Sequence, residues 1–216
     1  MFKGIIFDLD GTLLDTIETI SYYGNNSLKR HGLNPVEPEK YKLMAGNGAV
    51  HLVKCMIKEA GCTDESMFEK VFEDYNRTYG EDTLYKTKVY EGIMELLSGA
   101  KEKGMKLAVL SNKPHDATID VLGKFFKEGT FDLAFGARDG IPLKPDPTSA
   151  IELAKELGIS KDECIYVGDT SVDMQTGKGA GFFAVGVLWG FRDRKELEEN
   201  GADKIVSHPS EILDLI

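Results

Sequence analysis

Two acids, Asp8 and Asp10, follow the short apolar run GIIF and lead directly into Gly11. Acidic side chains are seldom buried unless they are paired or bound to a cation. An Asp-Gly pair is also a common turn signal, so a surface turn at the end of a strand explains these residues equally well. Other polar residues at corresponding places in the chain are needed to decide between the two interpretations.

Three later segments place further polar side chains after apolar runs or in loops. These segments contain Ser111 and Asn112, then Lys144 in PLKPDP, then Asp169 and Asp173 in GDTSVD. Taken singly, each segment is also compatible with a turn, a solvated loop or a helix N-cap. In open α/β sheets, however, ligands bind beyond the carboxyl ends of the strands. Four such segments in this order therefore favour one shared site.

The elements that must position these residues form an alternating pattern. Near-continuous apolar runs at 4–7, 106–110, 164–167 and 183–189 are typical of strands buried on both faces of a parallel sheet. Apolar residues at helical spacing over 93–100 and 150–157 predict intervening helices, each followed by a glycine. The alternation from Val89 onward predicts a Rossmann-like, doubly wound α/β sheet.

The segment between the first strand and the rest of the sheet has a different pattern. Apolar stripes at helical spacing run through 49–60 and 67–79, and no convincing strand separates them. An insertion of this length far exceeds an ordinary crossover. We therefore expect an α/β core of residues 1–14 and 87–216, with an inserted helical domain at 15–86.

The segments DLDGTLLD, SN, KP and GDTSVD resemble the four motifs of the haloacid dehalogenase superfamily. The resemblance covers essentially the whole chain, because the helical insertion is similar to the small cap that this family inserts after its first strand. Within the superfamily, SNKP together with GVLWGFRDRKELEENGAD is most similar to the phosphoglycolate-phosphatase-like branch.

This resemblance implies phosphoryl transfer through Asp8. A carboxylate can attack phosphorus and hold the phosphoryl group as an acyl phosphate, which splits one difficult step into two. Asp10 is then the general acid for the leaving alkoxide and later the general base for water. Dehalogenase members of the family lack this second acid, so Asp10 argues against a dehalogenase.

The resemblance also implies a Mg²⁺ ion, since a hard cation must offset the charge of the nucleophile beside a phosphate. Its expected ligands are Asp8, Asp169 and the backbone carbonyl of Asp10. Asp173 is expected to orient metal-bound water or to pair with Lys144.

The same resemblance assigns the phosphate-binding residues. Lys144 is expected to neutralise the nucleophile and one phosphoryl oxygen. The Ser111 hydroxyl and the Asn112 backbone N–H are expected to hold other phosphoryl oxygens, while Gly11 lets the backbone approach the phosphate closely.

We expect the reaction to be hydrolysis of a small phosphate monoester, phosphoglycolate-like or a sugar phosphate. A sugar-phosphate mutase shares the two acids, but such mutases place basic residues in the cap, whereas the loop LMAGNGAVHLV contains only His51 as a titratable side chain. Gly46, Asn47 and Gly48 in that loop offer backbone N–H groups suited to a small polar leaving group. A signalling protein that accepts phosphate is a third interpretation, which the helical insertion and Asp10 disfavour.

The composition limits the partners. The formal net charge is −10, which provides no general basic surface for nucleic acid. No apolar stretch reaches the roughly 18 residues of a membrane span. The three cysteines show no CxxC spacing, so we expect buried free thiols and a cytoplasmic protein. Lys113 and Arg138 lie near motif positions and are candidates for added positive potential.

Overall fold

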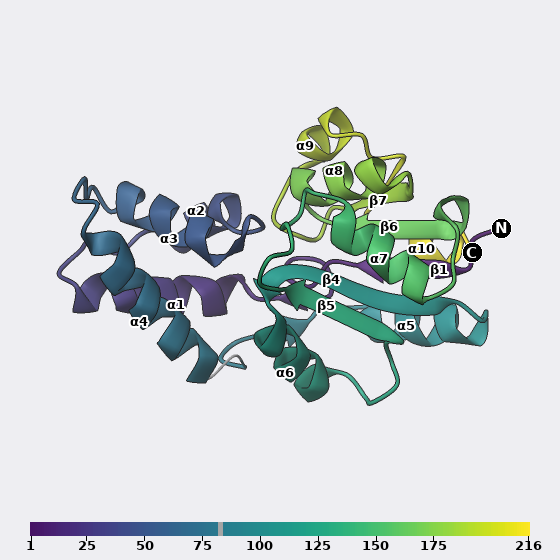
Figure 1. Ribbon diagram of the computed structural model, residues 1–216, viewed down its shortest axis with the longest axis horizontal. Coiled ribbons are helices and arrows are strands. Elements are labelled where there is room, and N and C mark those ends of the chain that lie inside the picture. Colours follow the sequence, from purple (N-terminus) through teal and green to yellow (C-terminus); the bar gives the residue numbers. More distant parts are fainter. Residues whose placement is uncertain (82–83) are drawn as a thin grey trace. The chain divides into compact units, whose positions relative to one another are not determined.

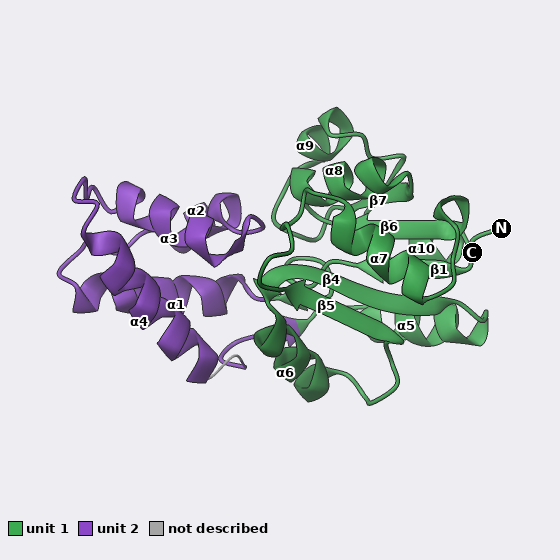
Figure 2. Cartoon of the chain, viewed as in Figure 1, with its two compact units in different colours: residues 1–15, 89–216 green, residues 16–88 purple. Residues whose placement is uncertain are grey.

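The computed structural model describes residues 1–81 and 84–216 and divides into two compact units, shown in Figure 2. Unit 1 comprises residues 1–15 and 89–216, and unit 2 comprises residues 16–88. These boundaries lie one and two residues later than those expected from the sequence. The predicted insertion also includes residues 82–83, which lie outside the described residues.

Unit 1 contains a six-stranded parallel sheet in the order β5-β4-β1-β6-β7-β8 (Figure 1). Its strands are β1 (Gly4–Phe7), β4 (Lys106–Pro114), β5 (Leu133–Ala137), β6 (Cys164–Gly168), β7 (Phe183–Val187) and β8 (Lys204–Val206). From β1 the chain builds β4 and β5 on one side, then β6, β7 and β8 on the other. The strand order therefore reverses between β1 and β6, and this is the position where open α/β sheets bind ligands.

Helices cover both faces of the sheet, which explains why the strands are apolar almost throughout. Ile5 and Phe7 share one core with α5 (Ile93–Glu102), α6 (His115–Phe125) and α10 (Ser210–Leu213). Ile6 points to the opposite core, formed with α7 (Thr148–Glu156) and α8 (Ser171–Ala180). A smaller cluster packs α9 (Arg194–Glu199) against β7 and α8. The predicted Rossmann-like fold is confirmed.

The structure adds detail that the sequence pattern did not provide. The strands β5 and β8 were not predicted, and a short 3₁₀ helix, η1 (Lys161–Glu163), precedes β6. The predicted end of one strand at Leu110 was too early, because β4 continues through Ser111 and Asn112 to Pro114. Its pairing with β5 shifts register between Leu110 and Pro114, so the last residues leave the regular ladder.

The described residues of unit 2 form four helices, α1 (Ile17–Arg30), α2 (Pro38–Met44), α3 (Gly48–Glu59) and α4 (Met67–Glu81). The two apolar stripes seen in the sequence lie on α3 and α4, and they bury residues such as Val53, Met56 and Val71. The side chain of Asn25 exchanges two hydrogen bonds with the backbone of Val36, which fixes the turn between α1 and α2.

The chain passes between the two units at β2 (Leu14–Asp15) and β3 (Lys88–Val89), which form a separate two-stranded sheet. No helix in the described part of the chain is both long and apolar enough to cross a membrane. All three cysteines are free thiols, as expected, although only Cys164 is buried, while Cys55 and Cys62 are partly exposed.

Candidate active site

The first and fourth motifs meet at the reversal of strand order. Asp8 directly follows β1 and Asp169 directly follows β6, and the Asp8 backbone N–H donates to the Val167 carbonyl at 2.9 Å. This bond extends the parallel ladder by one residue, so both carboxylates leave the sheet at the same edge. The neighbouring strands therefore bring together two acids that are 161 positions apart in the sequence.

Three carboxylates form a buried cluster at this edge. Asp8, Asp169 and Asp173 each offer an oxygen, and these atoms all lie within 4.8 Å of one another. Burial and, next, the charge of Asp173 raise the pKa of Asp8 well above its usual range. Burial and then Asp173 also raise the pKa of Asp169 to about 7. The cluster is electrostatically costly without a cation, because like charges in a desolvated site disfavour one another's ionised forms.

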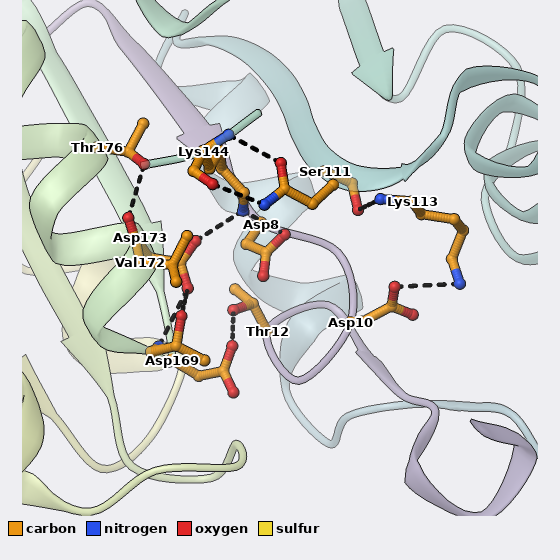
Figure 3. Close-up of polar contacts among 12 residues, drawn as sticks. Asp8, Asp10, Thr12, Ser111, Lys113, Lys144, Asp169, Val172, Asp173 and Thr176 are labelled. Atoms are coloured by element: carbon orange, nitrogen blue, oxygen red, sulfur yellow. Dashed lines mark hydrogen bonds and ion pairs between the residues drawn. The ribbon is translucent and has the colours of Figure 1, made fainter. Parts of the chain in front are cut away.

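Lys144 supplies part of the missing positive charge. Its Nζ lies 2.8 Å from Asp8 Oδ1 and 2.7 Å from Asp173 Oδ1. Figure 3 shows Lys144 together with these two acids. Burial alone would lower the pKa of Lys144, but the charges of Asp173 and Asp8 outweigh it and raise that pKa well above the usual range. Lys144 is therefore a fixed cation between the two acids.

Asn112 holds the backbone of Lys144 in place. Its side-chain amide donates to the Lys144 carbonyl at 3.0 Å, and its side-chain oxygen accepts from the Lys144 backbone N–H at 2.9 Å. The SN segment thus positions the KP segment that contains Lys144. This role of the Asn112 side chain was missed in the sequence, where only its backbone N–H was considered.

Both oxygens of Asp169 accept hydrogen bonds from neighbouring loops. Thr12 Oγ1 donates to Oδ1 at 3.1 Å, and the Phe191 backbone N–H donates to Oδ2 at 2.8 Å. The Trp189 indole N–H donates in turn to the Thr12 carbonyl at 3.0 Å. The sequence did not single out Thr12 or Phe191, because only the folded chain brings them to Asp169.

The two glycines in these loops leave room for the Asp169 carboxylate. Gly11 has φ +91°, and a Cβ there would lie 2.3 Å from Asp169 Oδ2. A Cβ on Gly190 would lie 2.5 Å from the same oxygen and 2.5 Å from the Gly11 carbonyl. Gly11 was expected to permit approach to a phosphate, which stays a prediction, and the structure shows that it permits the approach of the Asp169 carboxylate.

Asp10 points to a different partner. Its Oδ2 lies 3.1 Å from Lys113 Nζ, and its Oδ1 is buried without a hydrogen-bond partner among the described residues (Figure 3). Its side chain is therefore outside the three-carboxylate cluster. Ser111 lies nearby and its Oγ accepts from the Lys113 backbone N–H at 3.1 Å.

The remaining candidates belong to other elements of the chain. Gly46 and Asn47 precede α3 in unit 2 and Gly48 begins it, while His51 of the same helix lies 3.4 Å from Cys55 Sγ. Arg138 binds Glu152, with Nη2 2.5 Å from Oε2.

The cluster fits a divalent cation. Three carboxylates and one lysine leave a formal charge of −2 in a buried space, and carboxylate oxygens are the ligands that hard divalent cations prefer. Burial is the first cause that raises the pKa values of Asp8 and Asp169, and the negative charge of Asp173 adds to it.

Comparison with known proteins gives a consistent result. A family model described as haloacid dehalogenase-like hydrolase matches residues 5–187. The phosphoglycolate phosphatase of Aquifex aeolicus (strain VF5) is 32% identical over 98% of this chain and 95% of its own length. The crystal structure of a candidate phosphoglycolate phosphatase from Lactobacillus delbrueckii subsp. bulgaricus has a TM-score of 0.93 and 31% identity, covering 100% of this chain and 98% of that one.

Two more distant relatives are named for other activities. The N-acetylmuramic acid 6-phosphate phosphatase of Pseudomonas aeruginosa is 26% identical over 99% of this chain and 94% of its own length. A β-phosphoglucomutase from Clostridium difficile shares the fold, with a TM-score of 0.76 and 22% identity over 98% of this chain and 93% of that one. The family match, which spans most of the chain, and the identity to the curated phosphatases show that this chain belongs to the haloacid dehalogenase-like hydrolase family and is an enzyme of its phosphatase branch.

Proposed function

We propose that this enzyme is a Mg²⁺-dependent phosphatase that hydrolyses a small phosphate monoester, phosphoglycolate-like or a sugar phosphate, through an aspartyl-phosphate on Asp8. The observation that carries the proposal is the convergence of Asp8, Asp169 and Asp173 with Lys144 at the strand-order reversal. The relatives named phosphoglycolate phosphatase support the substrate class.

Mg²⁺ suits this arrangement because its ligands are hard oxygens. Asp8, Asp169 and the backbone carbonyl of Asp10 would hold the ion, with Asp173 orienting its surroundings. When bound, the ion supplies positive charge that offsets the nucleophile and the phosphoryl oxygens.

The first half-reaction forms a phosphorus–oxygen bond to Asp8 and breaks the ester bond. Lys144 binds Asp8 Oδ1, which orients the carboxylate and leaves the other oxygen, Oδ2, to attack phosphorus. The Ser111 hydroxyl and the Asn112 backbone N–H hold phosphoryl oxygens, which stabilises the charge that develops in the transition state. The departing alkoxide takes a proton from Asp10 and leaves as an alcohol.

The second half-reaction returns the enzyme to its starting state. Asp10, now ionised, removes a proton from a water molecule that has taken the place of the leaving group. The water oxygen attacks phosphorus, the bond to Asp8 breaks, and inorganic phosphate departs with the Asp8 carboxylate restored. One carboxyl group serves both halves, because the leaving group and the water occupy the same position in turn.

The test is phosphate release from a panel of small monoesters, with and without Mg²⁺, by the wild type and Asp8→Asn. We expect turnover that requires Mg²⁺ and is abolished by Asp8→Asn. Asp120→Asn, an exposed acid on α6, is the matched control and should keep full activity.

The fold of Asp8→Asn can be checked in the same experiment. Since burial and Asp173 disfavour the ionised Asp8, the metal-free variant should melt no lower than the wild type. Isomerisation of a sugar phosphate without release would favour a mutase. Uptake and retention of a single phosphate equivalent would favour a phosphate acceptor and contradict the role of Asp10. The cytoplasmic location and the absence of nucleic-acid or membrane partners stay predictions from the composition.

A further inference from the structure

Glu196 of α9 connects the two segments of the chain that carry and support Asp169. Its Oε1 accepts a hydrogen bond from the Ser171 backbone N–H at 3.0 Å, and its Oε2 lies 3.2 Å from Arg192 Nε. Ser171 begins α8 in the GDTSVD segment, whereas Arg192 belongs to the loop after β7. The helices α8 and α9 pack together with β7, so one carboxylate can reach both segments (Figure 1).

These two contacts close a ring of polar contacts around the Asp169 carboxylate. From Asp169 the chain runs to Ser171, whose N–H binds Glu196. The same carboxylate holds Arg192, and the preceding residue, Phe191, donates its backbone N–H to Asp169 Oδ2 at 2.8 Å. The ring therefore restrains Asp169 twice, through the chain that follows it and through the donor that binds its side chain.

Ser171 also lies between the two acids of the GDTSVD segment. Asp173 binds Lys144 through Oδ1 at 2.7 Å and accepts from the Thr170 hydroxyl through Oδ2 at 2.7 Å. Asp169 and Asp173 are both fully buried. Because the Ser171 N–H is fixed, the turn that joins these two acids is fixed as well. Groups that orient metal ligands from outside in this way commonly affect metal affinity.

A second acid of α9 shows how Glu196 differs from the solvated side of that helix. Glu198 pairs with Arg194 four residues earlier, with 3.5 Å between the charged atoms, and both side chains are more than half exposed. Such a pair contributes little to stability. In contrast, the side chain of Arg192 is only 8% exposed, and a buried guanidinium is costly unless its partner is held in a defined position.

We propose that Glu196 is a positioning residue, which holds Asp169 and Asp173 in the arrangement that binds the metal ion. This inference rests on the proposed function, in which Asp169 is a metal ligand. Glu196 lies outside the cluster of Asp8, Asp169 and Asp173. Loss of the ring leaves these three acids in the chain but holds them less firmly, so it lowers the affinity for Mg²⁺ and not the rate at saturating Mg²⁺.

The first test is Glu196→Gln. The variant keeps the size of the side chain but has only one oxygen, so it cannot accept from two donors that lie at different oxygens. We expect the affinity for Mg²⁺, measured by titration calorimetry, to fall about 3- to 10-fold, the effect of one lost hydrogen bond. The value of kcat at saturating Mg²⁺ should stay at the wild-type level. Glu198→Gln makes the same change on the same helix and should bind Mg²⁺ like the wild type.

Ser171→Pro tests the ring from its other side. Proline lacks the N–H that Glu196 accepts, and it is well tolerated at the first position of a helix. The preceding residue, Thr170, already has the extended backbone that a following proline requires, with φ −128° and ψ 166°. We expect Ser171→Pro to lose as much Mg²⁺ affinity as Glu196→Gln.

Amide hydrogen exchange of the metal-free protein provides a readout that does not depend on activity. In Glu196→Gln, we expect the Phe191 amide to exchange faster than in the wild type. The amides of β1, which lies between β4 and β6, should keep their wild-type rates. This comparison separates a local loss of order around Asp169 from a general loss of stability.

Three results would overturn the inference. These are an unchanged Mg²⁺ affinity in Glu196→Gln, an equal loss of affinity in Glu198→Gln, and faster exchange throughout β1, because Glu196 would then support the fold as a whole. Failure of the proposed function looks different, since the wild type itself then binds no Mg²⁺ and releases no phosphate.

Discussion

At the scale of single residues, the carboxylate of the proposed metal ligand Asp169 would couple cation binding to pH. Burial and, next, the charge of Asp173 raise its pKa from 3.8 to about 7, although hydrogen bonds from Phe191 and Thr12 act in the opposite direction. A cation binds the ionised carboxylate, so binding below about pH 7 must displace a proton. Since the folded pKa lies above the unfolded value, the metal-free protein also loses stability as the pH rises from about 4 to about 7.

We therefore expect the affinity for Mg²⁺ to fall by about tenfold or more between pH 8 and pH 6, with proton release on binding. Titration calorimetry in buffers of different ionisation enthalpy measures both quantities. Thr12→Val removes a hydrogen bond that lowers the pKa of Asp169, so it should weaken binding further at pH 7. Equal affinities at pH 6 and pH 8 would contradict this account.

The sequence was informative about which residues share the site and less so about their contacts. Strand ends in a parallel sheet meet at one edge, so Asp8 and Asp169 could be placed together from the pattern alone. The pairing of Lys113 with Asp10, and the bond from Thr12 to Asp169, depend on how loops cross above that edge. The periodicity of apolar residues predicts local structure only. It cannot predict these contacts, because each joins a side chain to a loop whose position depends on distant parts of the chain.

At the scale of elements, the loop after β7 forms hydrogen bonds to both the DLDGTLLD segment and the GDTSVD segment, and so holds them together. Trp189 binds the Thr12 carbonyl, and Phe191 binds Asp169 Oδ2. Between them, a Cβ on Gly190 would lie 2.3 Å from Asp169 Cβ and 2.5 Å from the Gly11 carbonyl oxygen. Neither neighbour is the far end of a flexible side chain, so a larger residue must displace one of the two loops.

Gly190→Ala is expected to weaken Mg²⁺ binding about 10- to 100-fold, as loss of support for a metal ligand commonly does. Gly123→Ala is the matched control, because a Cβ on that helical glycine meets nothing within 4 Å. The control should bind Mg²⁺ normally and melt slightly higher, since alanine favours a helix. The measurements are metal titration and thermal melting of both variants. An unchanged Mg²⁺ affinity in Gly190→Ala would show that the loop after β7 does not position Asp169.

The strands that could be predicted from the sequence are those with the most continuous runs of apolar residues. β1, β6 and β7 are buried on both faces and read as continuous apolar runs. β5 is only partly buried, and β8 has three residues beginning with an exposed lysine, so neither forms such a run. Both are the edge strands of the sheet, where one neighbour is missing and the demand for apolar residues is weaker.

At the scale of the whole molecule, the polar groups proposed for the chemistry all belong to unit 1. Asp8 and Asp10 come from its first segment, residues 1–15, and Lys144 and Asp169 from its second, residues 89–216. Unit 2 is one continuous insertion with its own buried helix faces. A change confined to a loop of unit 2 should therefore leave the proposed catalytic groups in place.

The loop between α2 and α3 provides the corresponding prediction. Gly46 and Gly48 have φ values of +107° and +83°, so the loop turns through backbone conformations that other residues rarely adopt. We expect removal of Asn47 to change the ranking of esters in a phosphatase panel more than it changes the rate with the best remaining substrate. Removal of Thr63, from the exposed loop between α3 and α4, is the matched control and should preserve the ranking. Equal losses on every ester after removal of Asn47 would place this loop outside substrate selection.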